Sequence, residues 1–156
     1  MGVSGVGKTT IGQALAERLG WRFMEGDDYH PADNVAKMAS GTPLEDADRW
    51  PWLDRLNLLL RELQVKNEPA VLTCSALKES YRRRLTKGLA PFQLVHLHGS
   101  YELIRARVGQ RKHRYMPASL LESQYATLEP PAHAIAVDVA AEAPSSVAAI
   151  AAQLGR

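Results

Sequence analysis

The feature that most constrains this chain is a glycine-rich stretch at its beginning. Residues Gly2 to Thr9 read GVSGVGKT, which fits the pattern G-x-x-x-x-G-K-[S/T]. Glycine tolerates positive φ and has no Cβ, so the backbone N–H groups of such a loop can converge on an anion. A helix that follows the loop adds the positive end of its dipole. The stretch therefore predicts a phosphate-binding loop that leads into a helix.

The residues that close this loop indicate a bound nucleoside triphosphate. Lys8 can reach the β- and γ-phosphates, and the Thr9 hydroxyl can ligate Mg²⁺. The guanine-reading motif N-K-x-D does not occur in the sequence, and the chain is short for a motor ATPase core. These observations favour an enzyme that transfers a phosphate from the nucleotide to a small molecule.

A loop of this kind normally follows a buried strand, but here Met1 alone precedes it. In such folds that strand lies in the middle of the sheet, so its loss would leave two neighbouring strands without ladder partners. Much smaller core losses already cost about 2–5 kcal/mol. We therefore expect the natural protein to begin upstream, with Met1 as the methionine inside the motif.

Length and composition are those of an ordinary globular chain. The 156 residues suffice for one domain with a sizeable core, so we expect a single domain over residues 1–156. A formal charge of +2 is too small to indicate nucleic-acid binding. No apolar stretch approaches the ~20 residues that cross a bilayer, and the phosphate loop stands where a secretory signal would. We expect a cytoplasmic protein without a membrane or nucleic-acid partner, in which the single cysteine, Cys74, is a small buried side chain.

Short apolar runs alternate with helical stretches, as in a parallel α/β sheet. The predicted strands are WRFMEGD, AVLTCSA, FQLVHLHG and AIAVDVA. The predicted helices are KTTIGQALAERLG, PADNVAKMASG, DRWPWLDRLNLLLRELQVKN from near Asp48, SYELIRARVGQRK, PASLLESQYATLEP and PSSVAAIAAQLGR. Because parallel crossovers are nearly always right-handed, the expected fold class is α/β: a doubly wound parallel sheet with helices on both faces, in three α/β/α layers.

One carboxylate at a strand end suits phosphoryl transfer. Asp27, in EGDDYHP, is the last residue of the first predicted strand, whereas AVLTC is followed by Ser75 and not by an acid. A carboxylate across from the phosphate loop can accept a proton from a substrate hydroxyl or hold a Mg²⁺-bound water. We predict these roles for Asp27 and a solvent-facing position for its neighbour Asp28.

The motifs GVSGVGKTT, EGDDYHP, KMASGTPLEDADRWPWL, CSALKESYR and LESQYATLEPP closely resemble those of the thermoresistant-type gluconokinases. The resemblance runs from Gly2 to about Pro131. These are small P-loop kinases similar in fold to shikimate and adenylate kinases, which implies a nucleoside-monophosphate-kinase-like fold. The resemblance also implies ATP-dependent phosphorylation of D-gluconate to 6-phosphogluconate, usually by a homodimer. With the Mg²⁺ ligand predicted at Thr9, the expected phosphate donor is Mg²⁺-ATP.

The resemblance further implies site residues. The ATP phosphate loop consists of Gly2, Val3, Ser4, Gly5, Val6, Gly7, Lys8, Thr9 and Thr10. Asp27 stands next to the acceptor hydroxyl. The gluconate pocket consists of His30, Arg49, Ser75, Lys78, Tyr81 and Arg82. Gluconate carries one carboxylate and a row of hydroxyls, so cations and polar groups suit its site. Lys78 and Arg82 are expected on one helix face, because they are four residues apart.

Each pocket residue has a plainer interpretation. His30 can simply cap a helix, Arg49 can pair with a nearby carboxylate, and Tyr81 can be a packing residue. Arg82, Arg83 and Arg84 are consecutive, so they cannot all face one ligand and at least one is expected in solvent.

The basic stretch RARVGQRKHR resembles the lid of related kinases, about residues 105–124. Arginines supplied by a lid stabilise charge on the transferring phosphoryl group. We predict this role for Arg111, and adenine stacking for Arg107. His113 stands where the family often has glycine, which departs from the pattern. The alternative is a solvated basic face or a weak RNA contact.

Two other functions compete with gluconate phosphorylation. The chain can be a shikimate-type or other sugar-acid kinase, whose acceptor pocket would differ around Arg49 and CSALK. It can also be a catalytically silent module that binds ATP without turnover. The presence of Lys8, Thr9, Asp27 and Arg111 argues against the silent module.

Overall fold

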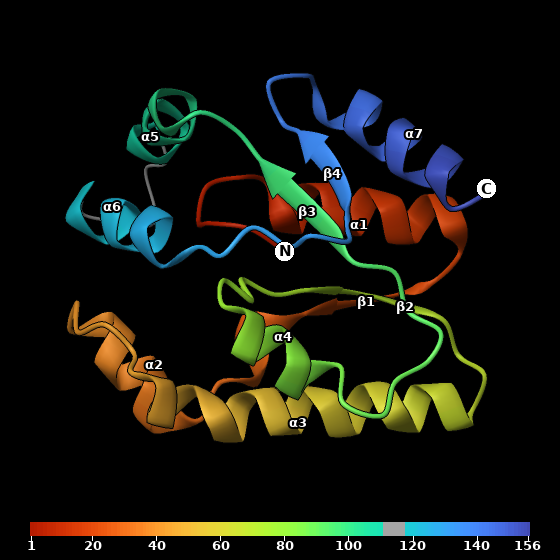
Figure 1. Ribbon diagram of the computed structural model, residues 1–156, viewed down its shortest axis with the longest axis horizontal. Coiled ribbons are helices and arrows are strands. Elements are labelled where there is room, and N and C mark those ends of the chain that lie inside the picture. The colour runs from red at the N-terminus through yellow and green to blue at the C-terminus, as the bar shows by residue number, and fades with distance from the viewer. Residues whose placement is uncertain (111–117) are drawn as a thin grey trace.

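The computed structural model describes residues 1–110 and 118–156. Its strands and helices alternate along the chain (Figure 1). In order they are α1 (Lys8–Leu19), β1 (Arg22–Glu25), the 3₁₀ turn η1 (Gly26–Tyr29), α2 (Ala32–Ala39), α3 (Asp46–Val65), β2 (Ala70–Thr73), α4 (Glu79–Leu85), β3 (Val95–His98), α5 (Tyr101–Gly109), α6 (Ala118–Thr127), β4 (Ile135–Asp138) and α7 (Ala143–Gln153).

The strands form two parallel pairs. In the first pair Arg22 lies opposite Ala70 and Glu25 opposite Thr73; in the second, Val95 lies opposite Ile135. Each strand is four residues long, shorter than the apolar run that predicted it. The parallel α/β architecture is confirmed.

The first residues of the chain lie between these two pairs. The Leu97 N–H donates to the Met1 carbonyl at 3.0 Å, and the Gly2 N–H donates to the Ser75 carbonyl at 3.2 Å. The phosphate loop therefore leaves the sheet between β2 and β3. In open parallel sheets, ligands bind beyond the carboxyl ends of the strands at such a position.

Local sequence signals account for the helix ends. Gly20 adopts a left-handed conformation at φ 66°, and its N–H bonds back to α1, so α1 ends where glycine was expected to stop it. α3 begins at Asp46, two residues before the predicted start. The reason is a capping box, in which the Asp48 carboxylate accepts the Glu45 N–H at 2.9 Å and Glu45 accepts the Asp48 N–H.

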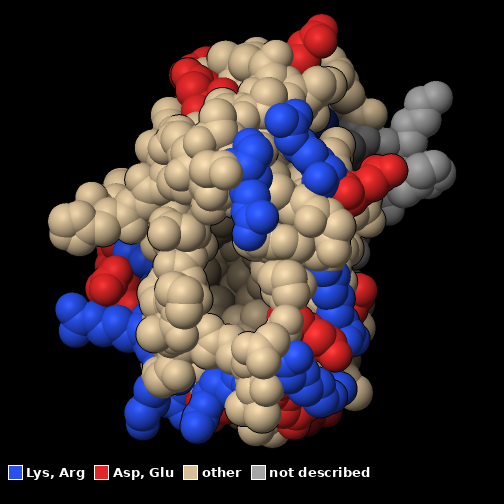
Figure 2. All heavy atoms as spheres, turned by 90° about the vertical axis from the view of Figure 1, so that its right-hand side faces the viewer, with Lys and Arg blue, Asp and Glu red and all other residues tan. Residues whose placement is uncertain are grey.

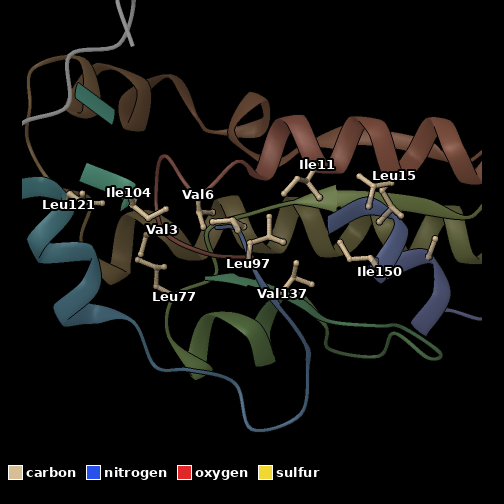
Figure 3. Packing of buried hydrophobic residues seen from close by; sticks show 13 residues of the cluster. Val3, Val6, Ile11, Leu15, Leu77, Leu97, Ile104, Leu121, Val137 and Ile150 are labelled. Carbon is tan, nitrogen blue, oxygen red and sulfur yellow. The ribbon is translucent and has the colours of Figure 1, made fainter. Parts of the chain in front are cut away.

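Helices cover both faces of the strands. α1 contacts α7 and also packs on β1 and β2, while α3 packs on α4 (Figure 1). Buried aliphatic side chains from the phosphate loop, α1, the second strand pair and α7 form one hydrophobic cluster (Figure 3). A second cluster lies around Trp52, Leu53 and Leu56 of α3 with Tyr81 and Leu85 of α4. The phosphate loop is thus anchored in the core through its own side chains.

Basic and acidic side chains intermingle over the lower part of the face shown in Figure 2, and the face is hollowed near its centre. No helix within residues 1–110 and 118–156 has the length and apolar character to span a bilayer.

Candidate active site

The phosphate loop is shaped by glycines that have no room for a side chain. Gly2 has φ +147°, and a Cβ there would lie 2.5 Å from the Leu97 carbonyl oxygen. Gly5 has φ +82°, and a Cβ there would lie 2.4 Å from Val108 Cγ2. Both positions therefore exclude other residues on conformational and steric grounds.

The remaining loop residues hold this shape. Val3 and Val6 are buried in the core. The Lys8 ammonium donates to the Val3 carbonyl at 3.0 Å, so its side chain folds back over the loop. Lys8 therefore lies over the loop whose N–H groups are predicted to bind phosphate oxygens.

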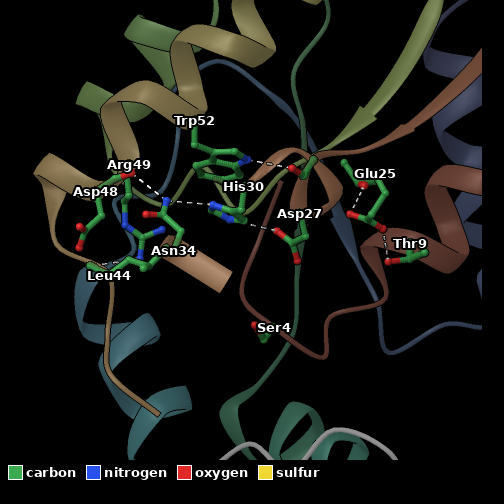
Figure 4. A network of polar contacts seen from close by, with 12 residues as sticks. Ser4, Thr9, Glu25, Asp27, His30, Asn34, Leu44, Asp48, Arg49 and Trp52 are labelled. Atoms are coloured by element: carbon green, nitrogen blue, oxygen red, sulfur yellow. Dashed lines mark hydrogen bonds and ion pairs between the residues drawn. The ribbon is translucent and has the colours of Figure 1, made fainter. Parts of the chain in front are cut away.

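A carboxylate that the sequence interpretation missed lies beside the loop. Glu25, the last residue of β1, accepts a 2.6 Å hydrogen bond from the Thr9 hydroxyl with Oε2 and another of 2.6 Å from the Thr73 hydroxyl with Oε1 (Figure 4). Since the Thr9 hydroxyl donates a hydrogen bond to Glu25, the lone pairs of its oxygen can face a cation. Glu25 thereby connects the phosphate loop to the ends of β1 and β2.

A cavity of about 590 Å³ opens at this point. Its lining includes Thr9, Glu25, Asp27 and Asp28. Mg²⁺ prefers oxygen ligands and keeps several of its waters. The hydroxyl and carboxylate oxygens that line the cavity are donors of this kind, so the residues present fit a magnesium-bound triphosphate. Asp27 and Asp28 are adjacent residues of the η1 turn, and both are exposed.

His30 is buried behind Asp27. Its ring stacks on Trp52 with centroids 4.0 Å apart, and its Nε2 lies 3.9 Å from Asp27 Oδ1 (Figure 4). The Trp52 indole N–H donates to the Gly26 carbonyl at 2.8 Å, which ties α3 to the η1 turn. Burial lowers the pKa of His30, an effect that Asp27 opposes and Arg49 reinforces. The imidazole contacts the Asn34 side chain and makes no backbone cap for α2.

A second polar cluster joins α3 to the start of α4. The Asp46 carboxylate accepts hydrogen bonds from the Lys78 ammonium, at 2.9 Å, and from the Tyr81 hydroxyl. The guanidinium of Arg49 lies 5.4 Å from the centre of the Tyr81 ring. These bonds, first that of Tyr81 and then that of Lys78, lower the pKa of Asp46, and the bond to Asp46 is the main cause of a raised pKa at Lys78. The predicted residues Arg49, Lys78 and Tyr81 are therefore brought together.

Arg82 does not join this cluster. Lys78 precedes α4 as its N-cap and its ammonium binds Asp46, so the two residues do not share a face of that helix. The Arg82 side chain is buried and donates to the carbonyls of Ala76 and Leu77, both at 3.0 Å. It also pairs with Glu79 at 2.9 Å.

The neighbours of Arg82 make other contacts. Arg83 is exposed beside Glu79, and Arg84 pairs with Asp54 at 2.6 Å. Ser75, at the end of β2, is half-buried, and its carbonyl accepts the N–H of Gly2.

The lid prediction is partly outside the described residues. Arg111, Arg114 and His113 lie in the segment 111–117, which the structure does not describe. Arg107, in α5, donates to the Val139 carbonyl at 2.7 Å. From α6, Gln124 accepts the Ser4 N–H at 2.7 Å and donates to the Ser4 hydroxyl at 3.1 Å. Gln124 thus contacts the phosphate loop, a role that no spacing rule along the chain would have indicated.

A nucleotide loop, an acid across a cavity from it and a separate cationic cluster together define a P-loop kinase that acts on a small acceptor. A family described as an AAA domain matches residues 1–131. The gluconokinase of Gluconobacter oxydans is 53% identical over 131 residues, which cover 84% of this chain and 74% of that relative. A probable gluconokinase of Xenopus tropicalis is 46% identical over 157 residues, with 89% of this chain and 83% of the relative covered. The crystal structure of a gluconokinase from Sinorhizobium meliloti has a TM-score of 0.89 at 44% identity and covers 100% of this chain and 89% of that one. The chain belongs to the gluconokinase family.

Proposed function

We propose that this protein transfers the γ-phosphoryl group of ATP to the 6-hydroxyl of D-gluconate and so forms 6-phospho-D-gluconate and ADP. The observation that carries the proposal is the position of Asp27. It lies on a cavity shared with Thr9 of the phosphate loop, and His30 and Trp52 connect it to α3, the helix that contributes Arg49. An acceptor held by the cationic cluster can therefore present a hydroxyl to both the acid and the nucleotide.

The transfer is an in-line displacement. The oxygen of the acceptor hydroxyl forms a bond to the γ-phosphorus, the bond from that phosphorus to the bridging oxygen of ADP breaks, and Asp27 receives the hydroxyl proton. Lys8 neutralises charge on the β- and γ-phosphates, and the N–H groups of residues Gly2 to Thr10 hold the phosphate oxygens. Among lid residues, we assign Arg111 to the transferring phosphoryl group and Arg107 to the adenine side.

A magnesium ion would be held by the Thr9 hydroxyl, with Glu25 and Asp27 acting through its bound waters, and would supply charge neutralisation for the triphosphate. Glu25 supports this assignment because it accepts a hydrogen bond from the Thr9 hydroxyl and so sets the orientation of the Thr9 oxygen. Second-sphere partners of this kind commonly orient the groups that bind metal directly.

In this proposal, cationic side chains bind the carboxylate of gluconate, and polar side chains bind its hydroxyl groups. We assign its carboxylate to Lys78 and Arg49, and its hydroxyls to Ser75, Tyr81, His30 and Asp46. The ammonium of Lys78 has three donors, so it can bind a ligand while it bonds to Asp46. Arg82 is assigned an indirect role, because it holds the carbonyls of the loop that presents Lys78. Assembly as a homodimer and a cytoplasmic location are further parts of the proposal.

The test is ADP release by the purified protein with Mg²⁺-ATP and one of D-gluconate, shikimate, glycerate or no acceptor. Release that depends on gluconate alone supports the proposal. Release with shikimate or glycerate instead would assign another acceptor, and nucleotide binding without release would indicate a silent module. Asp27→Asn should reduce kcat by about 10²–10⁴-fold, whereas Asp33→Asn, on the exposed side of α2, should leave kcat unchanged.

A further inference from the structure

His30 has a different partner at each ring nitrogen. Its Nε2 faces Asp27 Oδ1 at 3.9 Å, and its Nδ1 lies 3.3 Å from the amide nitrogen of Asn34 (Figure 4). Asn34 is a buried residue of α2, one turn after His30. Nothing in the phosphate-loop or gluconate motifs assigns a role to this asparagine.

The hydrogen positions on Asn34 and His30 follow from one neighbouring group, the Asp48 carbonyl. The Asn34 amide nitrogen also lies 2.8 Å from the Asp48 carbonyl oxygen, which can only accept a hydrogen bond. The side-chain atom that faces this carbonyl must therefore be the NH₂ group, and one of its hydrogens points to Asp48. The same NH₂ group presents its second hydrogen to His30, so Nδ1 must be the acceptor and the ring proton must be on Nε2.

We infer that Asn34 is a positioning residue that holds His30 neutral with its proton on Nε2, so that an uncharged donor faces the Asp27 carboxylate. The inference rests on the proposed function, in which Asp27 receives the proton of the acceptor hydroxyl. Asn34 acts through His30 and touches neither the nucleotide nor the acceptor.

The charge state matters because Asp27 must stay able to accept a proton. A neutral Nε2–H can orient the carboxylate or the acceptor without forming an ion pair, whereas an imidazolium would stabilise the ionised carboxylate and make it a weaker base. Two atoms 3.9 Å apart can both lie within ~2.8 Å of one hydroxyl oxygen. An acceptor hydroxyl can thus donate to Asp27 while His30 fixes its position.

The surroundings of His30 favour the same state. Trp52 covers one ring face, Asp27 is the facing acid, and Arg49 of α3 is the facing cation. Protonation would place a hydrogen on Nδ1 against the hydrogens of the Asn34 amide. The amide cannot turn its oxygen to Nδ1 without pointing that oxygen at the Asp48 carbonyl as well. This conflict acts in the same direction as burial, which lowers the pKa of His30.

The ring proton can be located directly by ¹⁵N NMR of the imidazole nitrogens in the wild-type protein. We expect the shift pattern of the Nε2–H tautomer for His30 at pH 7, with any change toward imidazolium at lower pH than in an ordinary histidine. A spectrum of the Nδ1–H tautomer, or of an imidazolium at pH 7, would overturn the inference. Because this measurement needs no turnover, it stays informative if gluconate proves not to be the acceptor.

Asn34→Asp replaces the donor with a carboxylate of the same shape and should stabilise the imidazolium. We expect kcat to fall about tenfold at pH 6 and to recover toward wild type as the pH rises above the raised pKa of His30. Asn57→Asp is the matched control, because Asn57 also donates from Nδ2 to two backbone carbonyls, at 2.7 and 2.9 Å, away from the site. It should not move the pH profile.

His30→Gln provides a second arm, since glutamine offers a donor that does not titrate. In this background Asn34→Asp should no longer shift the pH profile, because its effect passes through His30. A kcat loss in Asn34→Asp that is equal at every pH, with the Nε2–H tautomer retained, would assign Asn34 a structural role and refute the proposal.

Discussion

The hydroxyl of Thr9 donates a 2.6 Å hydrogen bond to the carboxylate of Glu25, across 16 residues of chain. The other oxygen of the same carboxylate accepts from Thr73, the residue that lies opposite Glu25 in the β1–β2 ladder. The Glu25 carboxylate therefore joins Thr9, at the end of the phosphate loop, to the ends of β1 and β2.

Glu25→Gln should weaken the use of magnesium. The amide can accept from one threonine only, and it presents hydrogens to the other. We expect the Mg²⁺ concentration for half-maximal activity to rise about 10–100-fold, the range found when partners of metal-binding groups are removed. Mg²⁺ titration of ADP release is the measurement. Glu17→Gln removes the same charge from an exposed position of α1 and should have no effect; an unaltered Mg²⁺ requirement in Glu25→Gln would make Glu25 a simple brace between strands.

Lys78→Met should raise the KM for gluconate and change kcat less. A hydrogen bond to a charged group contributes about 1.5–3 kcal/mol, so the expected rise is about 10–100-fold. Lys66→Met, at the exposed C-cap of α3, is the control. The measurement is initial rate against gluconate concentration, and a normal KM in Lys78→Met would remove Lys78 from the acceptor site.

The Asp46–Lys78 ion pair also predicts the pH range over which the KM for gluconate stays constant. The pKa of Asp46 is lowered, so its contribution to stability is present above the ordinary aspartate pKa and is lost as the pH falls through the lowered value. The pKa of Lys78 is raised, so its contribution is present below the ordinary lysine pKa and is lost as the pH rises through the raised value. Because these shifts keep both partners charged over the intervening range, the Asp46–Lys78 pair stays intact there. We therefore expect the KM for gluconate to be constant between roughly pH 6 and 9. Steady-state rates in a constant-ionic-strength buffer series test this, and a steep change within the window would contradict it.

Arg82→Lys should reduce stability more than substrate affinity. Both carbonyls accept from Nη1 of the guanidinium. A lysine ammonium ends one bond nearer the backbone, so these buried acceptors lose their partner. We expect the free energy of unfolding to fall by about 2–3 kcal/mol in urea titrations. Arg83→Lys, on the exposed side of the same helix, should change it little. A large rise in the KM for gluconate at unchanged stability would instead place Arg82 in direct contact with the acceptor.

Cys74 should not react in the folded protein. Burial raises the pKa of its thiol to about 12, so at pH 8 only ~10⁻⁴ of it is thiolate, the nucleophilic form. We expect a thiol reagent to label the protein only after addition of guanidinium chloride. Cys74 belongs to the second hydrophobic cluster, so labelling of the native protein at the rate of a free cysteine would show that this cluster opens readily.

Local signals predicted the phosphate loop, the parallel α/β order and the burial of Cys74, because each depends on residue types at short spacing. They did not predict Glu25, since its role depends on the register that places it opposite Thr73. They placed the start of α3 too late, because the Glu45–Asp48 capping box outweighs the apolar pattern from which the start was judged. Lys78 and Arg82 were expected on one face, but Lys78 lies outside α4 and the loop before that helix needs Arg82 for its own carbonyls.

The contact between Ser4 and Gln124 spans 120 residues. Helix α1 likewise packs on α7, and side chains of both helices belong to one hydrophobic cluster. Contacts this distant in sequence form late and slow the folding of a domain. During synthesis, the Ser4 N–H of the phosphate loop therefore cannot bond to Gln124 until that residue has left the ribosome. A truncated translation product would carry the nucleotide motif without a finished nucleotide site.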